Sequence, residues 1–405
     1  MNLEEIIKTT KLKTKEELLQ KVLESNPERY DFVLKYYKLK PKFMRYIKKI
    51  SSKVYKYKYI PYIGFSTERN IAKELISYYL EGKENGIGKD LKKLVQIKTI
   101  DLVSDIKAIP ATLEALPLTI LGEYWNLSMV GAYYAQSITK GKNVKVGVID
   151  TGVDYKHKEL KHLFRSEKGY DFVLEKPDGF DYNGHGTHVA GIIGGKTTGI
   201  APEVTMYSLR ILDEEGSGYE FDLIRAIEWA MDKKLDIVNM SLGSAYASVA
   251  LADICKEASQ KMILVAAAGN DGTEMPNYPA ALDGVISVAA IDESKEHAYF
   301  SNIHETVDIS APGVDIYSTF PYNEYRYLSG TSMATPHVTG SLALLRSISK
   351  TNLYENIMKS TAEKLDYNGS YDPELVFGAG LIRIDRMLDY IMKKEPKKRK
   401  RLFLF

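Results

Sequence analysis

The chain has 405 residues, more than one average domain needs, and its 44% apolar content is ordinary for a globular protein with a substantial core. Its 55 basic and 53 acidic residues leave a net charge of only +2. Such a balance argues against a protein that wraps nucleic acid with its whole surface. We therefore expect no nucleic-acid partner.

The first twenty residues, MNLEEIIKTTKLKTKEELLQ, lack the continuous apolar core of a secretory signal. No stretch approaches 18 uncharged apolar residues, so we expect no transmembrane segment and a cytoplasmic location. Cys255 is the only cysteine, which rules out an intrachain disulfide. Its surroundings, ADICKEASQKM, are helix-like, and we expect a small buried side chain there rather than a nucleophile.

Residues 1–55 are dense in Lys and Glu, with apolar residues such as Leu18, Leu19, Val22 and Leu23 at helical spacing. They are predicted to form a charged helical N-terminal extension. Residues 56–121 mix two periods and are predicted to form a small α+β domain. Its expected elements are a strand over 55–63, a helix over 70–80, a strand over 94–109, a short helix over 111–116 and a strand over 117–121.

Residues 122–390 carry near-continuous apolar runs that alternate with helical patterns. The expected strands are 143–150, 204–212, 235–242, 262–270 and 284–291, and the expected helices are 224–234 and 253–262. This pattern predicts an α/β domain with a parallel sheet and helices on both faces. Catalytic groups in such folds gather at the carboxyl ends of the strands.

Two motifs of this domain supply an acid and a base. VGVIDTGVD (146–154) places Asp150 directly after a buried strand, although a turn aspartate would look the same. NGHGTHVAG (183–191) places His185 between two glycines at the start of a helix. His185 and His188 lie three residues apart, but no third ligand completes a zinc pattern, so we expect no metal there.

Two further motifs supply a hydroxyl and an amide. SGTSMATPH (329–337) places Ser332 at a helix start that tolerates Pro336 in its first turn, where a lone serine would be read as a cap. AAAGNDG (266–272) ends a strand at Asn270, which could make a turn or aim its amide into a cleft. A serine becomes a nucleophile only when a base takes its proton and a third group orients that base.

Together, DTG, HGTHVAG and GTSMATPH resemble the signatures of the subtilisin-like serine proteases (peptidase S8) over roughly residues 120–390. The resemblance implies a serine endopeptidase acting on proteins or peptides. It also implies that Asp150 orients His185, that His185 is the base, that Ser332 is the nucleophile and that Asn270 donates to the oxyanion. The order of the three triad residues is that of subtilisin.

The same resemblance implies that Ser241, Leu242 and Gly243 form an edge strand that pairs with the substrate backbone. Asn277 matches the region that floors the primary specificity pocket. Many relatives carry an α+β propeptide that aids folding and blocks the cleft, so the segment before about 122 is expected to be an intramolecular inhibitor. Processing would then occur near 117–124.

Relatives often hold calcium in a loop after the histidine helix. Here the connection GIIGGKTTGIAP (191–202) is short and offers no Asn or Asp ligand, and Glu159 alone is far from the six to eight oxygens that calcium takes. We expect no required cofactor and no tight calcium site, while weak calcium binding stays open.

The tail, residues 391–405, has a basic run followed by apolar residues and reads as a solvated tail with a packed end, although contact with an anionic surface is an alternative. Two other functions also stay open. A catalytically silent relative acting as a binding module would usually lose a triad residue. An esterase would more often present G-x-S-x-G around its serine.

Overall fold

The computed structural model describes residues 30–39, 42–68, 70–72, 74–75, 95–102, 105–109, 112–113 and 124–394. The chain divides into two compact units. One unit comprises Met1–Asp105, Tyr219–Glu228 and Tyr246–Glu257, and the other comprises Ile106–Gly218, Trp229–Ala245 and Ala258–Phe405. Among the described helices, none combines the length and apolarity needed to cross a membrane.

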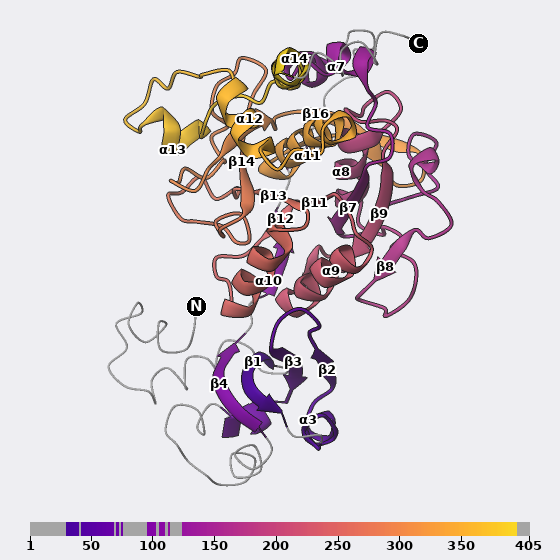
Figure 1. Cartoon of the computed structure of the whole chain (residues 1–405), viewed down its shortest axis with the longest axis vertical. Coiled ribbons are helices and arrows are strands. Elements are labelled where there is room, and N and C mark those ends of the chain that lie inside the picture. Colours follow the sequence, from indigo (N-terminus) through magenta and orange to yellow (C-terminus); the bar gives the residue numbers. More distant parts are fainter. Residues whose placement is uncertain are drawn as a thin grey trace. The chain divides into compact units, whose positions relative to one another are not determined.

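A seven-stranded parallel sheet forms the centre of the larger unit (Figure 1). Its strands are β7 (Lys145–Asp150), β8 (Gly169–Asp171), β9 (Thr205–Arg210), β11 (Ile237–Met240), β13 (Ile263–Ala267), β14 (Val285–Ile291) and β15 (Ile309–Pro312). They lie in the order β15-β14-β13-β11-β7-β9-β8. The predicted α/β class with a parallel sheet is confirmed.

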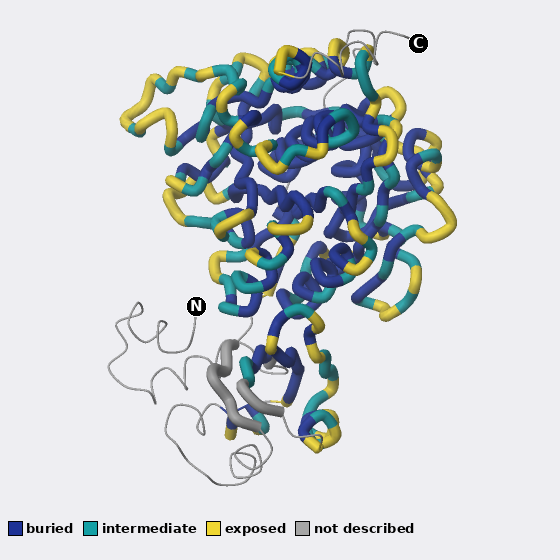
Figure 2. The backbone as a smooth tube through the Cα atoms, in the orientation of Figure 1, coloured by how far each residue is buried: buried dark blue, intermediate teal, exposed yellow. Residues whose placement is uncertain are grey.

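The central strands of the sheet are mostly apolar because both of its faces are covered. Every residue of β13 and of β14 is buried, and Figure 2 shows this sheet in the colour of buried residues. On one face lie α8 (His185–Gly194) and α11 (Thr331–Ile348), whose apolar side chains share a core cluster with Val146 and Val148 of β7. On the other face, Tyr207 of β9 packs against Trp229, with ring centroids 5.7 Å apart.

Two small sheets flank this core. In one, β5 (Asp105–Ala108) lies between β10 (Ser217–Tyr219) and β12 (Leu242–Gly243). In the other, β17 (Glu324–Ser329) lies between β16 (Ile316–Phe320) and β6 (Thr112–Leu113). Both therefore incorporate residues from the segment that precedes the main domain.

The remaining helices of this unit surround the sheet. They are α6 (Trp125–Met129), α7 (Ala132–Ile138), α12 (Tyr354–Thr361), α13 (Pro373–Phe377) and α14 (Ile384–Lys394), with a short 3₁₀ turn, η1 (Lys161–Leu163). The helices predicted over 224–234 and 253–262 are α9 (Glu220–Asp232) and α10 (Val249–Ser259). Cys255 is fully buried, as expected.

The smaller unit contains an antiparallel sheet in the order β2-β3-β1-β4. Its elements are β1 (Tyr30–Leu39), α3 (Phe43–Ile50), β2 (Lys53–Lys56), β3 (Tyr62–Thr67) and β4 (Val95–Leu102). Within the same unit, the carboxylate of Asp222 accepts from Lys53 Nζ at 2.8 Å, and Asp253 Oδ2 accepts from Tyr62 Oη at 2.8 Å. The acidic side chains near the starts of α9 and α10 thus belong to this unit.

The prediction of helices throughout residues 1–55 is wrong for Tyr30–Leu39, which is a strand. Its lysines suggested a solvated helix, but Phe32 and Leu34 are fully buried, and Phe32 stacks on Phe65 with ring centroids 5.6 Å apart. Aromatic side chains fit the pleated surface of a sheet well. Because β1 pairs with both β3 and β4, this sheet also crosses the predicted boundary at residue 55.

Three other predictions need correction. The strand expected over 55–63 is interrupted, because β2 ends at Lys56 and β3 begins at Tyr62. The strand expected over 94–109 is two strands, β4 and β5, which belong to different sheets. The helix expected over 111–116 is wrong at Thr112–Leu113, where backbone pairing with β17 makes a strand.

Some predictions fall wholly or partly outside the described residues. Residues 70–72 and 74–75 of the helix expected over 70–80 are helical, and the rest of that range is outside. The predicted helical positions Leu18 to Leu23, the strand over 117–121 and the tail from residue 395 onward also lie outside.

Candidate active site

Asp150 is the last residue of β7 and is fully buried. Its Oδ1 atom accepts a hydrogen bond from the backbone N–H of Thr151 at 2.7 Å and lies 2.8 Å from Nδ1 of His185. Because a carboxylate only accepts, the imidazole carries its proton on Nδ1. The sequence-predicted acid and base are therefore in direct contact.

His185 is the first residue of α8. Backbone conformation on one side of it and close packing on the other both require glycine. Gly184 adopts a φ of 116°, a left-handed conformation that favours glycine. A Cβ on Gly186 would lie 2.1 Å from the carbonyl oxygen of Gly152. The HGTH pattern thus allows the start of the helix to pack closely against the DTG turn.

Burial acts to lower the pKa of His185, but the charge and hydrogen bond of Asp150 act to raise it, and the net result lies above the ordinary value. His188 lies one turn further along α8 and differs. Burial lowers the pKa of His188 to about 3, and its Nε2 lies 3.0 Å from the carbonyl oxygen of Arg326. Within the described part of the chain, no group of three or more His, Cys, Asp or Glu side chains could hold a metal ion.

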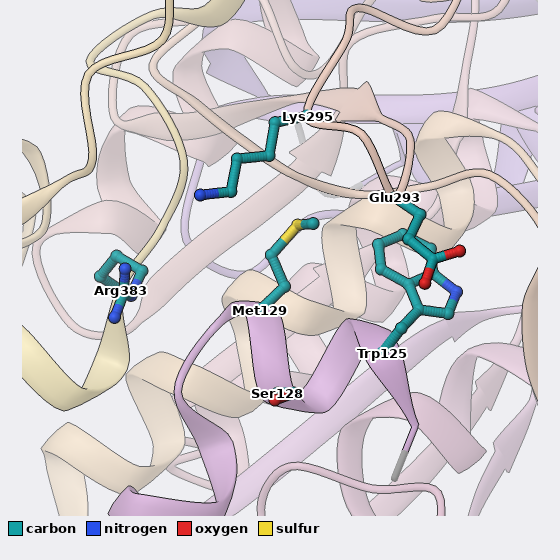
Figure 3. A pocket seen from close by; sticks show the side chains of 6 residues that line it. All are labelled: Trp125, Ser128, Met129, Glu293, Lys295 and Arg383. Carbon is teal, nitrogen blue, oxygen red and sulfur yellow. The ribbon is translucent and has the colours of Figure 1, made fainter. Parts of the chain in front are cut away.

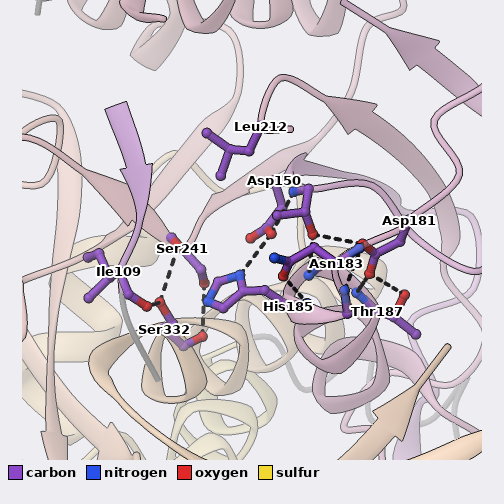
Figure 4. Close-up of polar contacts among 12 residues, drawn as sticks. Ile109, Asp150, Asp181, Asn183, His185, Thr187, Leu212, Ser241 and Ser332 are labelled. Atoms are coloured by element: carbon purple, nitrogen blue, oxygen red, sulfur yellow. Dashed lines mark hydrogen bonds and ion pairs between the residues drawn. The ribbon is translucent and has the colours of Figure 1, made fainter. Parts of the chain in front are cut away.

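Ser332 is the second residue of α11 and is fully buried. Its hydroxyl lies 3.1 Å from the carbonyl oxygen of Ser241 and 3.3 Å from that of Ile109, and can donate to either. Ser241 returns a hydrogen bond from its own hydroxyl to the Ser332 carbonyl oxygen at 2.9 Å. In Figure 4, the His185 ring is seen between Asp150 and Ser332.

Asn270 follows β13 and is half-buried. Its Oδ1 atom accepts hydrogen bonds from the Thr331 backbone N–H at 2.9 Å and from the Thr331 hydroxyl at 2.8 Å. These two bonds fix the orientation of the side-chain amide. Its NH₂ group therefore faces away from Thr331, the residue directly before Ser332.

The predicted edge strand is paired with the chain itself. In antiparallel register, Leu242 pairs with Ala108 and Gly243 pairs with Lys107. On the other side of β5, the Ala108 N–H donates to the carbonyl oxygen of Gly216 at 2.7 Å. The segment that ends at Ile109 is thus held by backbone hydrogen bonds on both sides.

Asn277 is buried, and its Nδ2 donates to the carbonyl oxygen of Ala267 at 3.0 Å. A Cβ on Gly243 would lie 2.0 Å from that same Nδ2 atom. Asn277 thus packs directly against the edge strand, and its place in the floor of the specificity pocket stays a prediction.

Two groups at this site were missed from the sequence. Ile109 was assigned to a strand, but nothing marked its carbonyl as a contact of Ser332. Asp181 is fully buried and accepts hydrogen bonds around the start of α8. Its signal was available, because an aspartate four residues before His185 in FDYNGH can serve the unpaired N–H groups of a helix start.

A pocket of about 470 Å³ lies apart from these residues (Figure 3). It is lined by Trp125, Ser128, Met129, Glu293, Lys295 and Arg383. Both of its cations, Lys295 and Arg383, form ion pairs with Glu363. None of the predicted site residues lines this pocket, and its charges are balanced by Glu363.

Comparisons with known proteins show which family this chain is similar to. The model of the subtilase family matches residues 141–380, more than half of the chain. Subtilisin DY of Bacillus licheniformis is 41% identical over 259 residues, which cover 61% of this chain and 91% of that protein. The major intracellular serine protease of Bacillus subtilis (strain 168) is 37% identical over 282 residues, 66% of this chain and 84% of that protein.

A thermostable alkaline protease of Halalkalibacterium halodurans is 39% identical over 269 residues, 65% of this chain and 72% of that protein. All three similarities are too extensive to rest on short motifs alone. The chain therefore belongs to the subtilase family (peptidase S8) and is a serine endopeptidase.

Proposed function

We propose that this endopeptidase cuts peptide bonds through an acyl-enzyme, with Ser332 as the nucleophile, His185 as the base and Asp150 as the group that orients His185. The observation that carries the proposal is the position of Ile109. Its carbonyl oxygen lies 3.3 Å from Ser332 Oγ, and the strand that leads to it is hydrogen-bonded like a bound peptide. This contact places a peptide carbonyl group beside the serine hydroxyl, as in a bound substrate, and attack would bring the carbonyl carbon itself to Oγ.

In the proposed reaction, Ser332 Oγ bonds to the substrate carbonyl carbon while its proton passes to His185 Nε2. The resulting tetrahedral intermediate expels the amine, which takes the proton from His185 as the C–N bond breaks. Water then attacks the ester carbon while His185 takes a proton from the water. The C–O bond to Ser332 breaks, and Ser332 Oγ takes that proton back from His185, which releases the acid and restores the serine. Asp150 keeps the Nδ1–H tautomer, so that Nε2 is free to accept a proton.

Asn270 is proposed to donate its side-chain N–H to the oxyanion, together with the backbone N–H of Ser332. The fixed orientation of the amide supports this role, because Thr331 engages only the oxygen end. A donor held in place before the reaction costs no reorganisation when charge develops.

We further propose that residues 105–113 act as an intramolecular inhibitor. In this register, Ile109 supplies the carbonyl that faces Ser332, and Thr112–Leu113 pair with Leu328–Ser329 of β17. Paired backbone thus lies on both sides of the reacting position. The residue after Ile109 is Pro110, whose ring nitrogen carries no N–H and whose φ is fixed, both of which restrict its fit as a leaving group.

The bound segment also indicates the class of substrate. Ile106 and Ile109 are buried, with 1% and 5% of their surface exposed, whereas Lys107 between them is exposed. We therefore propose a preference for apolar side chains at the residue that supplies the carbonyl and at the third residue before it. Ala108 packs close to Gly216, which favours a small side chain at that position.

The experiment compares Ile109→Asp with Lys107→Asp in the full chain. Labelling of Ser332 by a fluorophosphonate is measured before any shortening, with intact mass recorded beside it. A carboxylate in an apolar subsite costs well over the roughly 1.4 kcal/mol that equals tenfold. We therefore expect Ile109→Asp to be labelled about tenfold faster than the wild type or more.

Lys107→Asp is the matched control, because the same strand keeps its backbone bonds and only an exposed side chain changes. We expect it to be labelled at the wild-type rate. Equal labelling of all three proteins would rule out inhibition by this segment. No labelling of any of them, with no casein hydrolysis, would rule out Ser332 as the nucleophile.

A further inference from the structure

The carboxylate of Asp181 is fully buried and accepts five hydrogen bonds. Oδ1 accepts from the Thr151 hydroxyl and from the backbone N–H groups of Asn183 and Gly184, each at 2.9 Å. Oδ2 accepts from the Thr187 N–H at 2.9 Å and from the Thr187 hydroxyl at 2.6 Å. Figure 4 shows Asp181 on the opposite side of His185 from Ser332 in this view.

The partners of Asp181 favour a negative charge on it, because three of the five hydrogen bonds come from backbone N–H groups, which can only donate. Both hydroxyls already accept a hydrogen bond elsewhere, Thr151 from the Gly186 N–H at 3.0 Å and Thr187 from the Asp154 N–H at 2.9 Å. Each hydroxyl can therefore direct its own proton to Asp181. Burial raises the pKa of Asp181 above its ordinary value, and the hydrogen bonds, which favour the ionised form, offset only part of that rise.

Two sets of hydrogen bonds connect Asp181 to the surroundings of His185. At the helix start, it satisfies the N–H groups of Gly184 and Thr187, which flank His185 and have no partner within α8. At the DTG turn, it holds the hydroxyl of Thr151, whose own backbone N–H donates to Asp150 Oδ1. One carboxylate thus ties the segment that carries His185 to the segment that carries Asp150.

We propose that Asp181 is a positioning residue that keeps the His185 ring aligned with Asp150 and adds a second negative charge to the surroundings of the base. The inference rests on the proposed role of His185. The charges of Asp150 and Asp181 both act to raise the pKa of His185, against the lowering effect of burial. Neutral His188 adds no charge, since its pKa is lowered to about 3.

The test is Asp181→Asn in the full chain, with kcat and KM normalised to the sites that a fluorophosphonate titrates. An amide NH₂ in place of one oxygen faces donors, so the alignment is lost. Displacement of a catalytic group by about 1 Å can cost on the order of 10²-fold, and we expect a loss of that size in kcat with KM little changed. Removal of the charge should also lower the pKa of His185 and move the acid limb of kcat/KM to lower pH.

Asp154→Asn is the matched control. Asp154 is a buried carboxylate in the same region that accepts from the backbone N–H groups of Lys156 and Tyr322 but touches neither Thr151 nor Gly184. Its loss should leave the acid limb in place. If Asp181→Asn does not fold, Thr151→Val removes the hydroxyl link and should lower kcat, whereas Thr151→Ser keeps the link and should retain it.

Wild-type kcat and an unmoved acid limb in Asp181→Asn would overturn the inference, and so would an equal shift in Asp154→Asn. If Asp181→Asn does not fold, equal kcat in Thr151→Val and Thr151→Ser would overturn it. His185→Ala separates these results from a failure of the proposed function. An inactive His185→Ala beside a wild-type-like Asp181→Asn removes only the role of Asp181. An active His185→Ala removes the base assignment itself.

Discussion

The two halves of the active site are assembled in different ways. Asp150 and His185 lie 35 positions apart in the chain, are both buried, and are joined by a hydrogen bond between Oδ1 and Nδ1. Ser332 instead meets Ser241, 91 positions away, and Ile109, 223 positions away. The base half is a local structure of the main domain, whereas the nucleophile half takes one of its contacts from the segment before that domain.

Because of this difference, the alignment of the proposed base does not depend on the segment that covers the proposed nucleophile. The bond between Asp150 and His185 uses no atom of residues 105–113, so departure of that segment leaves the base and its tautomer in place. The same departure removes the Ile109 carbonyl from Ser332 and opens the strand position between β10 and β12. We therefore propose that activation of this endopeptidase requires clearing the cleft rather than building a catalytic group.

The largest effect should come from the nucleophile. In subtilisin, loss of the corresponding serine costs about 10⁶ in kcat, and we expect Ser332→Ala to lose activity to a similar extent while the fold is kept. Since autocleavage needs the nucleophile, this variant should also stay at full length while the wild type shortens from its N-terminus. Casein hydrolysis and intact mass measure the two effects.

A value of more than a few per cent of wild-type hydrolysis in Ser332→Ala would contradict the assignment. Shortening of Ser332→Ala at the wild-type rate would show instead that another protease removes the segment. Thermal unfolding is the control, since the loss of one hydroxyl should leave the melting temperature close to that of the wild type.

A smaller effect is expected at Asn270. Thr331 holds the oxygen end of the Asn270 side-chain amide. We therefore expect Asn270→Ala to remove the proposed donor and to leave His185 in place. The equivalent change in subtilisin costs about 10²–10³ in kcat, and we expect a similar loss with little change in KM. A variant that changes only KM would mean that Asn270 binds the ground-state substrate.

The sequence signals that single out the proposed base half and the proposed nucleophile are local. Asp150, His185 and Ser332 each lie where a buried apolar strand or helix meets a glycine, and the structure places all three at such junctions. The parallel sheet was predictable for the same reason, since β13 is apolar from end to end and β14 is apolar except for Ser287.

The missed features depend on distant partners. Thr112 and Leu113 looked helical in isolation, but their backbone pairs with Ser329 and Leu328 some 216 positions later, which overrides local preference. Tyr30–Leu39 was hidden for the same reason, because the neighbours of β1 lie in β3 and β4. Periodicity within a segment carries no information about which strand a segment will join.

Glu159 lies before α8 in the chain and contacts the loop that follows that helix. It sharpens the comparison, because the backbone N–H and the hydroxyl of one threonine satisfy its carboxylate, as those of Thr187 do for Asp181. Glu159 is buried, and its Oε2 accepts from the Thr197 N–H at 2.7 Å and from the Thr197 hydroxyl at 3.2 Å. The described residues around it offer no group of acidic ligands for an ion. We propose that these hydrogen bonds hold the loop and that no tight calcium site exists here.

Chelation should then have the smallest effect of all. An ion at a hundredfold excess over its dissociation constant adds about 2.7 kcal/mol of stability, which in a domain of this size equals several degrees in melting temperature. We expect EDTA to lower the melting temperature by less than that. Glu159→Ala should melt earlier than the wild type by the same amount with and without EDTA, because the lost bonds to Thr197 involve no ion. If EDTA destabilises the wild type by several degrees and has no effect on Glu159→Ala, the carboxylate binds calcium and the local account of this loop is wrong.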